Sequence, residues 1–222
     1  MIVADLEALE LGDDDQRHLV KVLRLRPGEL VSATDGQGGW RPTRYQPGPV
    51  LVPDGDIERV PRTQPTLTVG FAPVKGDRPE WAVQKLTEIG IDRIVLLSAE
   101  RSVVRWDRDR AVHHLDRLRA VARQALMQSR QVWLPELAGV EPVASLSAEP
   151  GVALAAPDGA APTLAYPSVL IGPEGGWTPA EEGAARATVR LGPTTLRTES
   201  AAVVAGALLA GLRAGVVRSV LS

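Results

Sequence analysis

Short apolar runs that alternate with helical segments constrain the fold of this chain more than any other feature. Ile94–Leu97, Val152–Ala156 and Val169–Ile171 contain no polar residue. Continuous apolar runs of this length are typical of strands that are buried on both faces of a parallel sheet. Asp77–Ile89 and Asp107–Ser129 have helical character. Strands that alternate with helices predict an α/β domain with a mainly parallel sheet.

Weaker signals extend this domain toward the C-terminus. Thr66–Ala72 and Val189–Leu191 are predicted strands, and Glu199–Arg213 is the predicted last helix. Thr178–Glu181 is a capping box with proline at the first helical position. The predicted buried side of the 107–129 helix consists of Val112, Leu115, Leu118, Ala122 and Ala125.

The N-terminal part of the chain has a different pattern. Its short apolar stretches are interrupted by closely spaced turn signals such as Asp35-Gly36 and Asp54-Gly55, which predict a small antiparallel β-barrel or sandwich. Pro61–Pro65 predicts a linker. We therefore expect two domains, a β-barrel over residues 1–62 and an α/β domain over residues 66–222.

The composition excludes several kinds of site. The chain has no cysteine and three histidines, so disulfides and thiolate metal sites are excluded and a histidine-based metal site is not expected. The uncharged stretch Ser200–Leu212 is too short to span a bilayer, and the first residues lack the pattern of a signal peptide. We expect a cytoplasmic protein that has neither a membrane segment nor a metal ion.

Arginines are concentrated in one stretch although the net charge of the chain is only −2. Residues 101–130 contain eight arginines and three aspartates, and arginine suits both phosphate binding and base stacking. The stretch is either an RNA-binding surface or a solvated helical face. The spacing of Arg123 and Arg130 predicts that both lie on nearly the same side of a helix.

Two predicted strands end in unusual backbone, which we call the first hinge (Gly172–Gly176) and the second hinge (Leu191–Leu196). The first contains three glycines, a proline and the carboxylate of Glu174. Glycine lets a ligand approach the main chain closely, and open α/β sheets bind ligands at the carboxyl ends of their strands. Neither hinge is a P-loop or a Gly-x-Gly-x-x-Gly motif. Recognition of a purine by main-chain groups is the favoured interpretation, and an elaborate turn is the alternative.

The hinge sequences also carry a family resemblance. LIGPEGGWTPAE at residues 170–181, followed by LGPTTLRTESAA at residues 191–202, closely resembles the RsmE family of ribosomal RNA methyltransferases, within the SPOUT superfamily. Other stretches agree with the family: Lys75–Arg78, Gln84-Lys85, Glu88–Gly90, Glu100–Ser102, Ala122–Gln124 and Gln128–Arg130. Arg17–Leu19 and Val22–Arg24 are similar to its PUA-like RNA-binding domain.

The resemblance implies a specific activity and architecture. The activity is transfer of a methyl group from S-adenosyl-L-methionine to N3 of a uridine in 16S ribosomal RNA, within the small ribosomal subunit. The architecture is a PUA-like β-barrel followed by a SPOUT trefoil-knot α/β domain, assembled as a homodimer. Two alternatives stay open: a non-catalytic RNA-binding or ribosome-assembly protein that kept the fold, and a different nucleotide-binding enzyme.

The resemblance and the chemistry of uracil together select candidate residues. N3 of uracil carries a proton at neutral pH, so catalysis needs a proton acceptor and stabilisation of charge on the uracil carbonyls. We expect Glu174, Arg197 and Glu199 to be catalytic, with Glu174 facing the methyl group and the uracil. The residues expected to bind the cofactor are Leu170, Ile171, Gly172, Pro173, Gly175, Gly176, Leu191, Gly192, Thr195 and Leu196. The residues expected to bind RNA are Arg17, His18, Arg24, Lys75, Arg101, Arg123 and Arg130.

Several of these candidate residues, and some of their neighbours, also have a purely structural interpretation. Glu174 could satisfy amides of its own turn, and Glu199 could stabilise a helix N-terminus through the helix dipole. Trp177 is interpreted as a packing anchor rather than a base-stacking platform. The small residues Ala205–Ala207 suit close helix packing, either within the chain or at a dimer contact.

Overall fold

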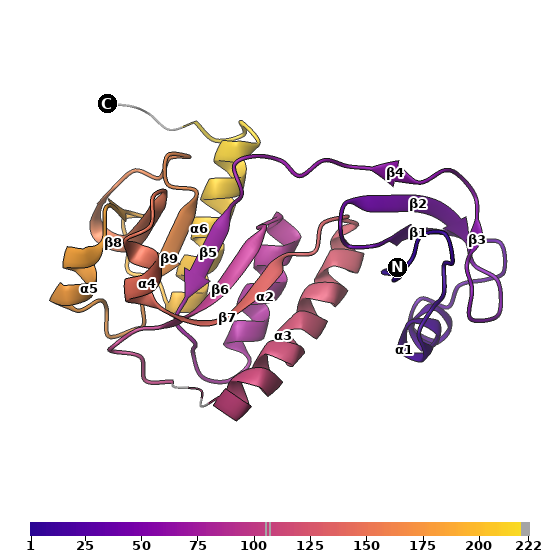
Figure 1. Cartoon of the computed structure of the whole chain (residues 1–222), viewed down its shortest axis with the longest axis horizontal. Coiled ribbons are helices and arrows are strands. Elements are labelled where there is room, and N and C mark those ends of the chain that lie inside the picture. The colour runs from indigo at the N-terminus through magenta and orange to yellow at the C-terminus, as the bar shows by residue number, and fades with distance from the viewer. Residues whose placement is uncertain (105, 107, 219–222) are drawn as a thin grey trace. The chain divides into compact units, whose positions relative to one another are not determined.

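The computed structural model describes residues 1–104, 106 and 108–218, which form two compact units (Figure 1). The first unit comprises Met1–Arg62 and Leu126–Leu134. The second comprises Thr63–Ala125 and the described residues from Pro135 onward. No pattern in the sequence indicated that a segment from the middle of the chain packs with the first unit.

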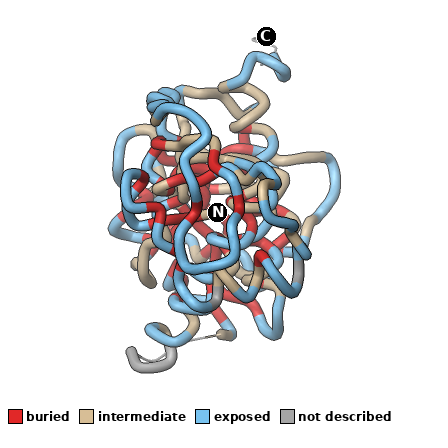
Figure 2. The backbone as a smooth tube through the Cα atoms, turned by 90° about the vertical axis from the view of Figure 1, so that its right-hand side faces the viewer, coloured by how far each residue is buried: buried red, intermediate tan, exposed pale blue. Residues whose placement is uncertain are grey.

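The first unit is built around an antiparallel sheet, as predicted. Strand β1 (Leu30–Thr34) pairs with β2 (Gly39–Arg44), which pairs with both β3 (Val52–Pro53) and β4 (Glu58–Arg59). The unit also contains a short helix that was not predicted, α1 (Asp13–Arg17), which continues as the π-helix η1 (His18–Val22). The unit has its own buried positions, and Figure 2, which looks onto the N-terminus, shows buried stretches beside exposed loops. These positions include Val3, Leu6, Leu9, Leu11, Leu19, Ala33, Tyr45 and Leu51.

A carboxylate fixes the turn between β1 and β2. Asp35 Oδ1 accepts hydrogen bonds from the backbone N–H groups of Gln37 at 2.7 Å and Gly39 at 2.9 Å, and its Oδ2 meets the Arg59 guanidinium at 2.6 Å. Burial raises the pKa of Asp35, but the two backbone hydrogen bonds and Arg59 outweigh burial and hold this pKa below its usual value. The Asp-Gly signal therefore marks a real turn.

The second unit contains a six-stranded parallel sheet, which confirms the predicted α/β class. Its strands are β5 (Thr68–Phe71), β6 (Arg93–Ser98), β7 (Glu136–Pro142), β8 (Val152–Ala160), β9 (Ser168–Ile171) and β10 (Thr188–Val189). Their spatial order is β10-β8-β9-β5-β6-β7. After η1, the described helices are α2 (Arg78–Ile89), α3 (Arg108–Ser129), α4 (Val143–Ser147), α5 (Pro179–Ala184) and α6 (Thr198–Arg213).

Helices α2 and α6 pack together behind strands β5 and β6 in the view of Figure 1. A Cβ atom at Gly206 would lie 2.6 Å from a methyl carbon of Leu86, so any larger residue would force the Leu86 side chain to move. The predicted role of the Ala205–Ala207 segment in close packing is thus confirmed at Gly206, inside one chain. A core cluster that includes Val95, Leu97, Leu170 and two residues of α4 also contains Trp177, which confirms Trp177 as a packing anchor.

Some predicted details differ from the structure. Val112 was expected on the buried side of α3, but 53% of its surface is exposed; Leu115, Leu118, Ala122 and Ala125 are buried as predicted. Asp107, the expected first residue of that helix, lies outside the described residues. Strand β7 was missed because it is an edge strand whose sequence, ELAGVEP, lacks a continuous apolar run. In the described part of the chain, no helix has the length and apolarity needed to cross a membrane.

Candidate active site at the two hinges

The first hinge follows β9 and is held tightly by its surroundings. A Cβ atom at Gly172 would lie 3.0 Å from the Trp177 ring, so glycine leaves room for that buried indole. Gly176 has a φ of 70°, and its N–H donates to Pro173 O at 2.8 Å. Both glycines therefore have a structural reason to be glycine.

Arg101, which was expected to contact RNA, fastens the first hinge. Its Nη1 donates to Gly175 O at 3.2 Å and to Trp177 O at 2.8 Å. The predicted capping box of α5 is also present: Thr178 and Glu181 exchange side-chain and backbone hydrogen bonds. Glu181 Oε1 additionally accepts the N–H of Glu100 at 3.0 Å. The loop after β6 therefore holds both the hinge and the helix that follows it.

The second hinge, in contrast, has few contacts with the protein. No described atom outside its chain neighbours lies within 4 Å of the position that a Cβ at Gly192 would take, and the φ of Gly192 is not positive. The main-chain groups of Leu191–Leu196 make no hydrogen bond to other described residues. The two hinges meet at Thr198, whose Oγ1 donates to Gly172 O at 2.9 Å.

Arg78 brings the two predicted acids together. Its Nη1 lies 3.4 Å from Glu174 Oε1 and 3.6 Å from Glu199 Oε1, and its Nε donates to Lys75 O at 3.2 Å. Arg78 stands at the first position of α2, so three separate segments of the chain converge on one guanidinium. Sequence reasoning did not select Arg78, although the Lys75–Arg78 stretch was part of the family resemblance.

The two acids have different environments. The Glu174 side chain is 61% exposed, whereas that of Glu199 is 9% exposed. Glu199 Oε2 is buried and has no hydrogen-bond partner among the described residues. A buried carboxylate oxygen without a partner is costly unless a ligand or substrate completes it. Glu199 is therefore the acid of the pair that is buried and has an oxygen without a partner among the described residues.

Other predicted residues surround this cluster. Leu170 and Ile171 are buried in β9. Pro173, Leu191 and Leu196 are partly buried, while Thr195 is exposed. Arg197 is exposed at the N-cap of α6, and its side chain makes no cap hydrogen bond. The hinges and the acids are thus brought together, with Arg197 at their edge.

Comparison with known proteins places the chain in a family. Residues 62–210 match the family described as an RNA methyltransferase domain, and residues 11–47 match the RNA methyltransferase PUA domain. The ribosomal RNA small subunit methyltransferase E of Mycobacterium tuberculosis is 35% identical over 90% of this chain and 86% of its own length. The chain belongs to the RsmE family of ribosomal RNA methyltransferases.

Solved structures agree with this membership in the RsmE family. The ribosomal RNA small subunit methyltransferase E of Neisseria gonorrhoeae, solved with bound S-adenosylmethionine, has 25% identity and a TM-score of 0.78, over 96% of each chain. A methyltransferase of Legionella pneumophila in complex with the same cofactor has 27% identity and a TM-score of 0.77, over 90% of each chain. Both cover the two units together, so the resemblance seen in the sequence is confirmed.

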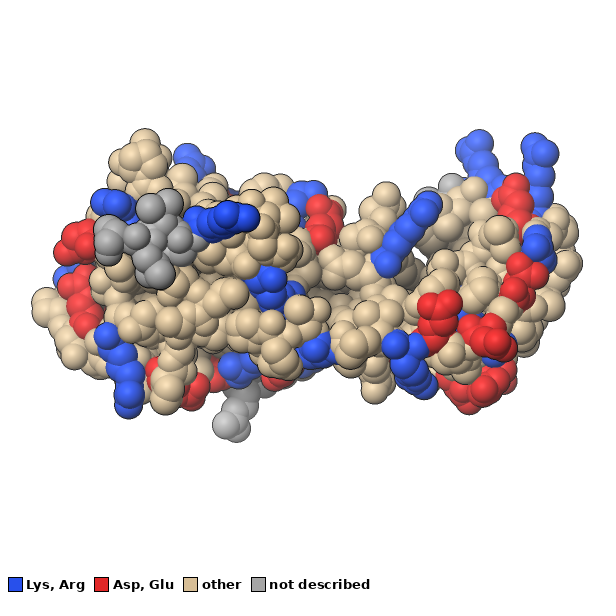
Figure 3. Space-filling view, turned by 90° about the horizontal axis from the view of Figure 1, so that it is seen from above, with Lys and Arg blue, Asp and Glu red and all other residues tan. Residues whose placement is uncertain are grey.

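The residues that the RsmE resemblance suggested for RNA contact are distributed over both units. Arg17, His18 and Arg24 lie in or just after the α1 and η1 helices, and Arg17 Nε donates to Asp13 O at 3.3 Å. Lys75 is exposed near Arg78. On the face shown in Figure 3, basic side chains stand singly among acidic and neutral ones.

The expected pairing of Arg123 and Arg130 on one helical face is wrong. Helix α3 ends at Ser129, and Arg130 has a φ of 56°, which is a left-handed conformation outside the helix. Helical spacing therefore does not set the direction of the Arg130 side chain. Two members of the charged stretch that suggested this surface, Arg105 and Asp107, lie outside the described residues.

Proposed function

We propose that this chain methylates N3 of a uridine in the 16S ribosomal RNA of the small subunit, with S-adenosyl-L-methionine as the methyl donor. Membership of the RsmE family makes the chain a ribosomal RNA methyltransferase that uses this cofactor. One observation supports the acceptor atom in particular. A buried carboxylate with a free oxygen, Glu199, stands beside the Arg78 guanidinium at the junction of the two hinges. The oxygen without a partner suits acceptance of a proton from a ring nitrogen, and the guanidinium suits stabilisation of the charge that develops on the uracil.

The hinges fit the cofactor. The open space at Gly192 and the unbonded main-chain groups of Leu191–Leu196 leave donors and acceptors available to an adenosine. The main chain of Leu170–Gly176 supplies the opposite wall, with Gly172 O fixed by Thr198. When bound there, S-adenosylmethionine supplies an activated, electrophilic methyl group.

The chain's own residues then handle the proton and the charge. Glu199 Oε2 would accept the proton from uracil N3, which leaves on N3 the electron pair for the new N–C bond. The bond between the methyl carbon and the sulfonium sulfur would break in the same transfer, with S-adenosylhomocysteine as the leaving group. Arg78 holds Glu199 in place and offers positive charge to the uracil carbonyl on which negative charge develops. Glu174, at the exposed side of Arg78, adds negative charge near a sulfonium. Arg197 is placed to contact the RNA at the rim.

The decisive experiment is methyl transfer onto small ribosomal subunits that lack the mark. Radiolabelled cofactor and mass spectrometry of the digested RNA should reveal one N3-methyluridine. Free 16S RNA and fully modified subunits are the controls. No incorporation on any of these would favour the alternative of an RNA-binding assembly protein, and a methyl group on carbon or on ribose oxygen would overturn the proposed acceptor atom.

We also propose that the protein acts in the cytoplasm as a homodimer. Gly206 is occupied by contacts to Leu86 inside the chain, so the contact has to use the opposite side of α6. There Val203, Val204 and Leu208 are partly exposed and Ala207 is exposed, on a helix without charge from Ser200 to Leu212. Light scattering should give about twice the chain mass of 23.6 kDa, and Leu208→Glu should give the monomer.

A further inference from the structure

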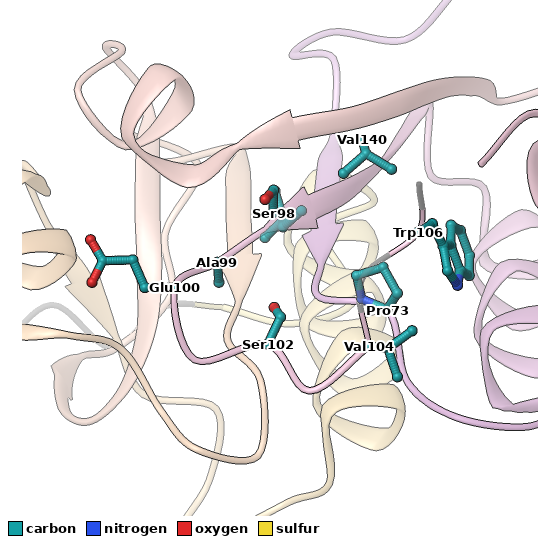
Figure 4. A pocket seen from close by; sticks show the side chains of 9 residues that line it. Pro73, Ser98, Ala99, Glu100, Ser102, Val104, Trp106 and Val140 are labelled. Atoms are coloured by element: carbon teal, nitrogen blue, oxygen red, sulfur yellow. The ribbon is translucent and has the colours of Figure 1, made fainter. Parts of the chain in front are cut away.

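A cavity of about 420 Å³ lies in the second unit, beside the carboxyl ends of β5 and β6 (Figure 4). Ligand pockets in proteins typically measure roughly 300–1,000 Å³. Its apolar walls include Pro73, Leu97 and Val140. None of the described lining residues belongs to either hinge, and none is Arg78, Glu174 or Glu199. The cavity is therefore lined by residues other than those of the proposed cofactor and acid site.

Two side chains give the cavity features that suit a nucleobase. Trp106 lines it and is stacked on His114, with ring centroids 4.2 Å apart and planes 11° apart. Ser102 also lines it; the residue is 8% exposed, and its Oγ is buried without a hydrogen-bond partner among the described residues. A hydroxyl can both donate and accept a hydrogen bond, and an unpaired buried one is completed by a polar ligand.

The charges of the walls argue for a neutral ligand group. Among the lining residues that the structure describes, none is lysine or arginine. Figure 4 shows the Glu100 carboxylate turned away from Pro73, Ser102 and Trp106. Such walls suit an uncharged ring more than a phosphate, and aromatic side chains are the common platform for unstacked bases of RNA.

The cavity is mechanically joined to the first hinge. The segment from Glu100 to Ser102 lines it on both sides of Arg101, and Arg101 donates to Gly175 O and Trp177 O. The N–H of Glu100 is held by Glu181 in the helix after that hinge. The cavity and the first hinge therefore share the loop after β6.

We propose that the cavity binds an unstacked nucleobase next to the methyl-acceptor uridine, with Trp106 as its stacking platform and Ser102 as its hydrogen-bonding partner. The proposal rests on the proposed function, because it takes the ligand to be the substrate RNA. The same chemistry could receive the adenine of the cofactor, so the test has to separate these two sources.

The test measures RNA affinity for each combination of a protein variant and an RNA variant, as in a double-mutant cycle. The probe is a short RNA oligonucleotide with the small-subunit sequence around the target uridine, in which each flanking base in turn is replaced by an abasic ribose. Loss of one stacked base or of its aromatic platform should weaken RNA binding by about 5- to 100-fold. In the Trp106→Leu protein, one of the abasic replacements should cause no further loss of RNA affinity. The Trp106→Phe protein should keep most of its affinity for the unmodified RNA. Calorimetry should show unchanged affinity of both variants for S-adenosylmethionine.

Ser102→Ala provides a second variant in case Trp106→Leu fails to fold. Because the hydroxyl has no partner in the described structure, its removal should leave thermal stability intact and weaken RNA binding only when the same flanking base is present. A fall in cofactor affinity with unchanged RNA binding would assign the cavity to the adenine and overturn the proposal. Independent effects at every abasic position would overturn it as well. Binding is measured without methyl transfer, so the outcome is distinct from a failure of the proposed reaction.

Discussion

The two hinges both leave parallel strands at their carboxyl ends, but the protein holds them in different ways. In the first hinge, Gly172 faces the Trp177 ring, Gly176 needs a positive φ, and Arg101 binds the carbonyls of Gly175 and Trp177. In the second, Gly192 has neither a positive φ nor a close neighbour among the described atoms. Contacts within the chain therefore fix the first hinge, whereas the second hinge makes few contacts with the described residues.

The same contrast applies to the two acids. Glu174 belongs to the first hinge and is mostly exposed, whereas Glu199 follows the second hinge and is buried, with one oxygen that has no partner among the described residues. The two acids that the sequence analysis selected together therefore differ in exposure. A carboxylate held inside the site is better placed to accept a proton than one that water already surrounds.

The largest effect is expected from comparing the two acids in single-turnover methyl transfer. Glu199→Gln keeps the side-chain volume but removes the proton acceptor, so the rate should fall by about 10²- to 10⁴-fold. Glu174→Gln should cost less than about tenfold. The loss in Glu199→Gln should shrink as pH rises, because hydroxide increasingly supplies deprotonated uracil.

Cofactor affinity, measured by calorimetry, is the control for both acid variants. It should be nearly normal in Glu199→Gln and weakened in Glu174→Gln if Glu174 faces the sulfonium. A severe rate loss in Glu174→Gln together with a normal Glu199→Gln enzyme would reverse the assignment, and would restore the preference for Glu174 that the sequence alone suggested.

The next effect concerns the glycines of the hinges. Gly192→Val adds a side chain to open space, so it should weaken cofactor binding at least about tenfold while the free energy of unfolding changes by no more than about 0.5 kcal/mol. Gly172→Val forces the new side chain against Trp177 and should lower the free energy of unfolding by about 1–3 kcal/mol. Calorimetry and thermal unfolding measure both. Normal cofactor affinity in Gly192→Val would contradict the placement of the adenosine.

Part of the fold could be predicted from the sequence alone. Continuous apolar runs predicted the strands β6, β8 and β9, and the capping box predicted the start of α5, because burial and capping are local and have strong residue preferences. Strand β7 was not predicted, because an edge strand needs no continuous apolar run. The family resemblance included both hinges and the Lys75–Arg78 stretch, which the structure brings together.

What the sequence could not predict depends on contacts between distant residues. Nothing in the Lys75–Arg78 stretch shows that Arg78 will lie between two acids about a hundred residues further along the chain. Arg101 looked like an RNA ligand because arginine suits phosphate, but its hydrogen bonds go to two backbone carbonyls. The same pattern made Gly172 and Gly192 look alike, although only three-dimensional packing distinguishes them.

A smaller effect is expected from loosening the first hinge. Arg101→Gln removes the donor that binds Gly175 O and Trp177 O, and the free energy of unfolding should fall by about 1 kcal/mol, because the side chain is largely exposed. Cofactor affinity should fall several-fold as the wall becomes mobile. Arg123→Gln, at an exposed position of α3, is the control and should change stability by less than about 0.5 kcal/mol. Equal stability of the two variants would show that the first hinge is not held by Arg101.

The smallest effect tests whether a turn in the first unit is fixed as the first hinge is. Asp35 accepts two backbone N–H bonds and meets Arg59, and its folded pKa is held below its usual value. A carboxyl whose pKa is lower in the folded state contributes stability that is present above its unfolded pKa, about 3.9, and is lost as pH falls through the folded pKa.

Asp35→Asn should therefore lower the free energy of unfolding by about 1 kcal/mol at pH 7, and the difference from the unsubstituted protein should shrink as pH falls below about 4. Thermal unfolding of both proteins between pH 7 and pH 3 measures this difference. Asp54→Asn is a matched control, because Asp54 meets Arg44 at 2.9 Å on the surface, where such pairs contribute little. If the difference between Asp35→Asn and the unsubstituted protein stayed constant with pH, the charge of Asp35 would not be what fixes the turn. The loss in Asp35→Asn would then come only from poorer hydrogen-bond geometry of the amide. In that case a charged side chain would not be needed to hold this turn, and the comparison with Arg101 in the first hinge would fail.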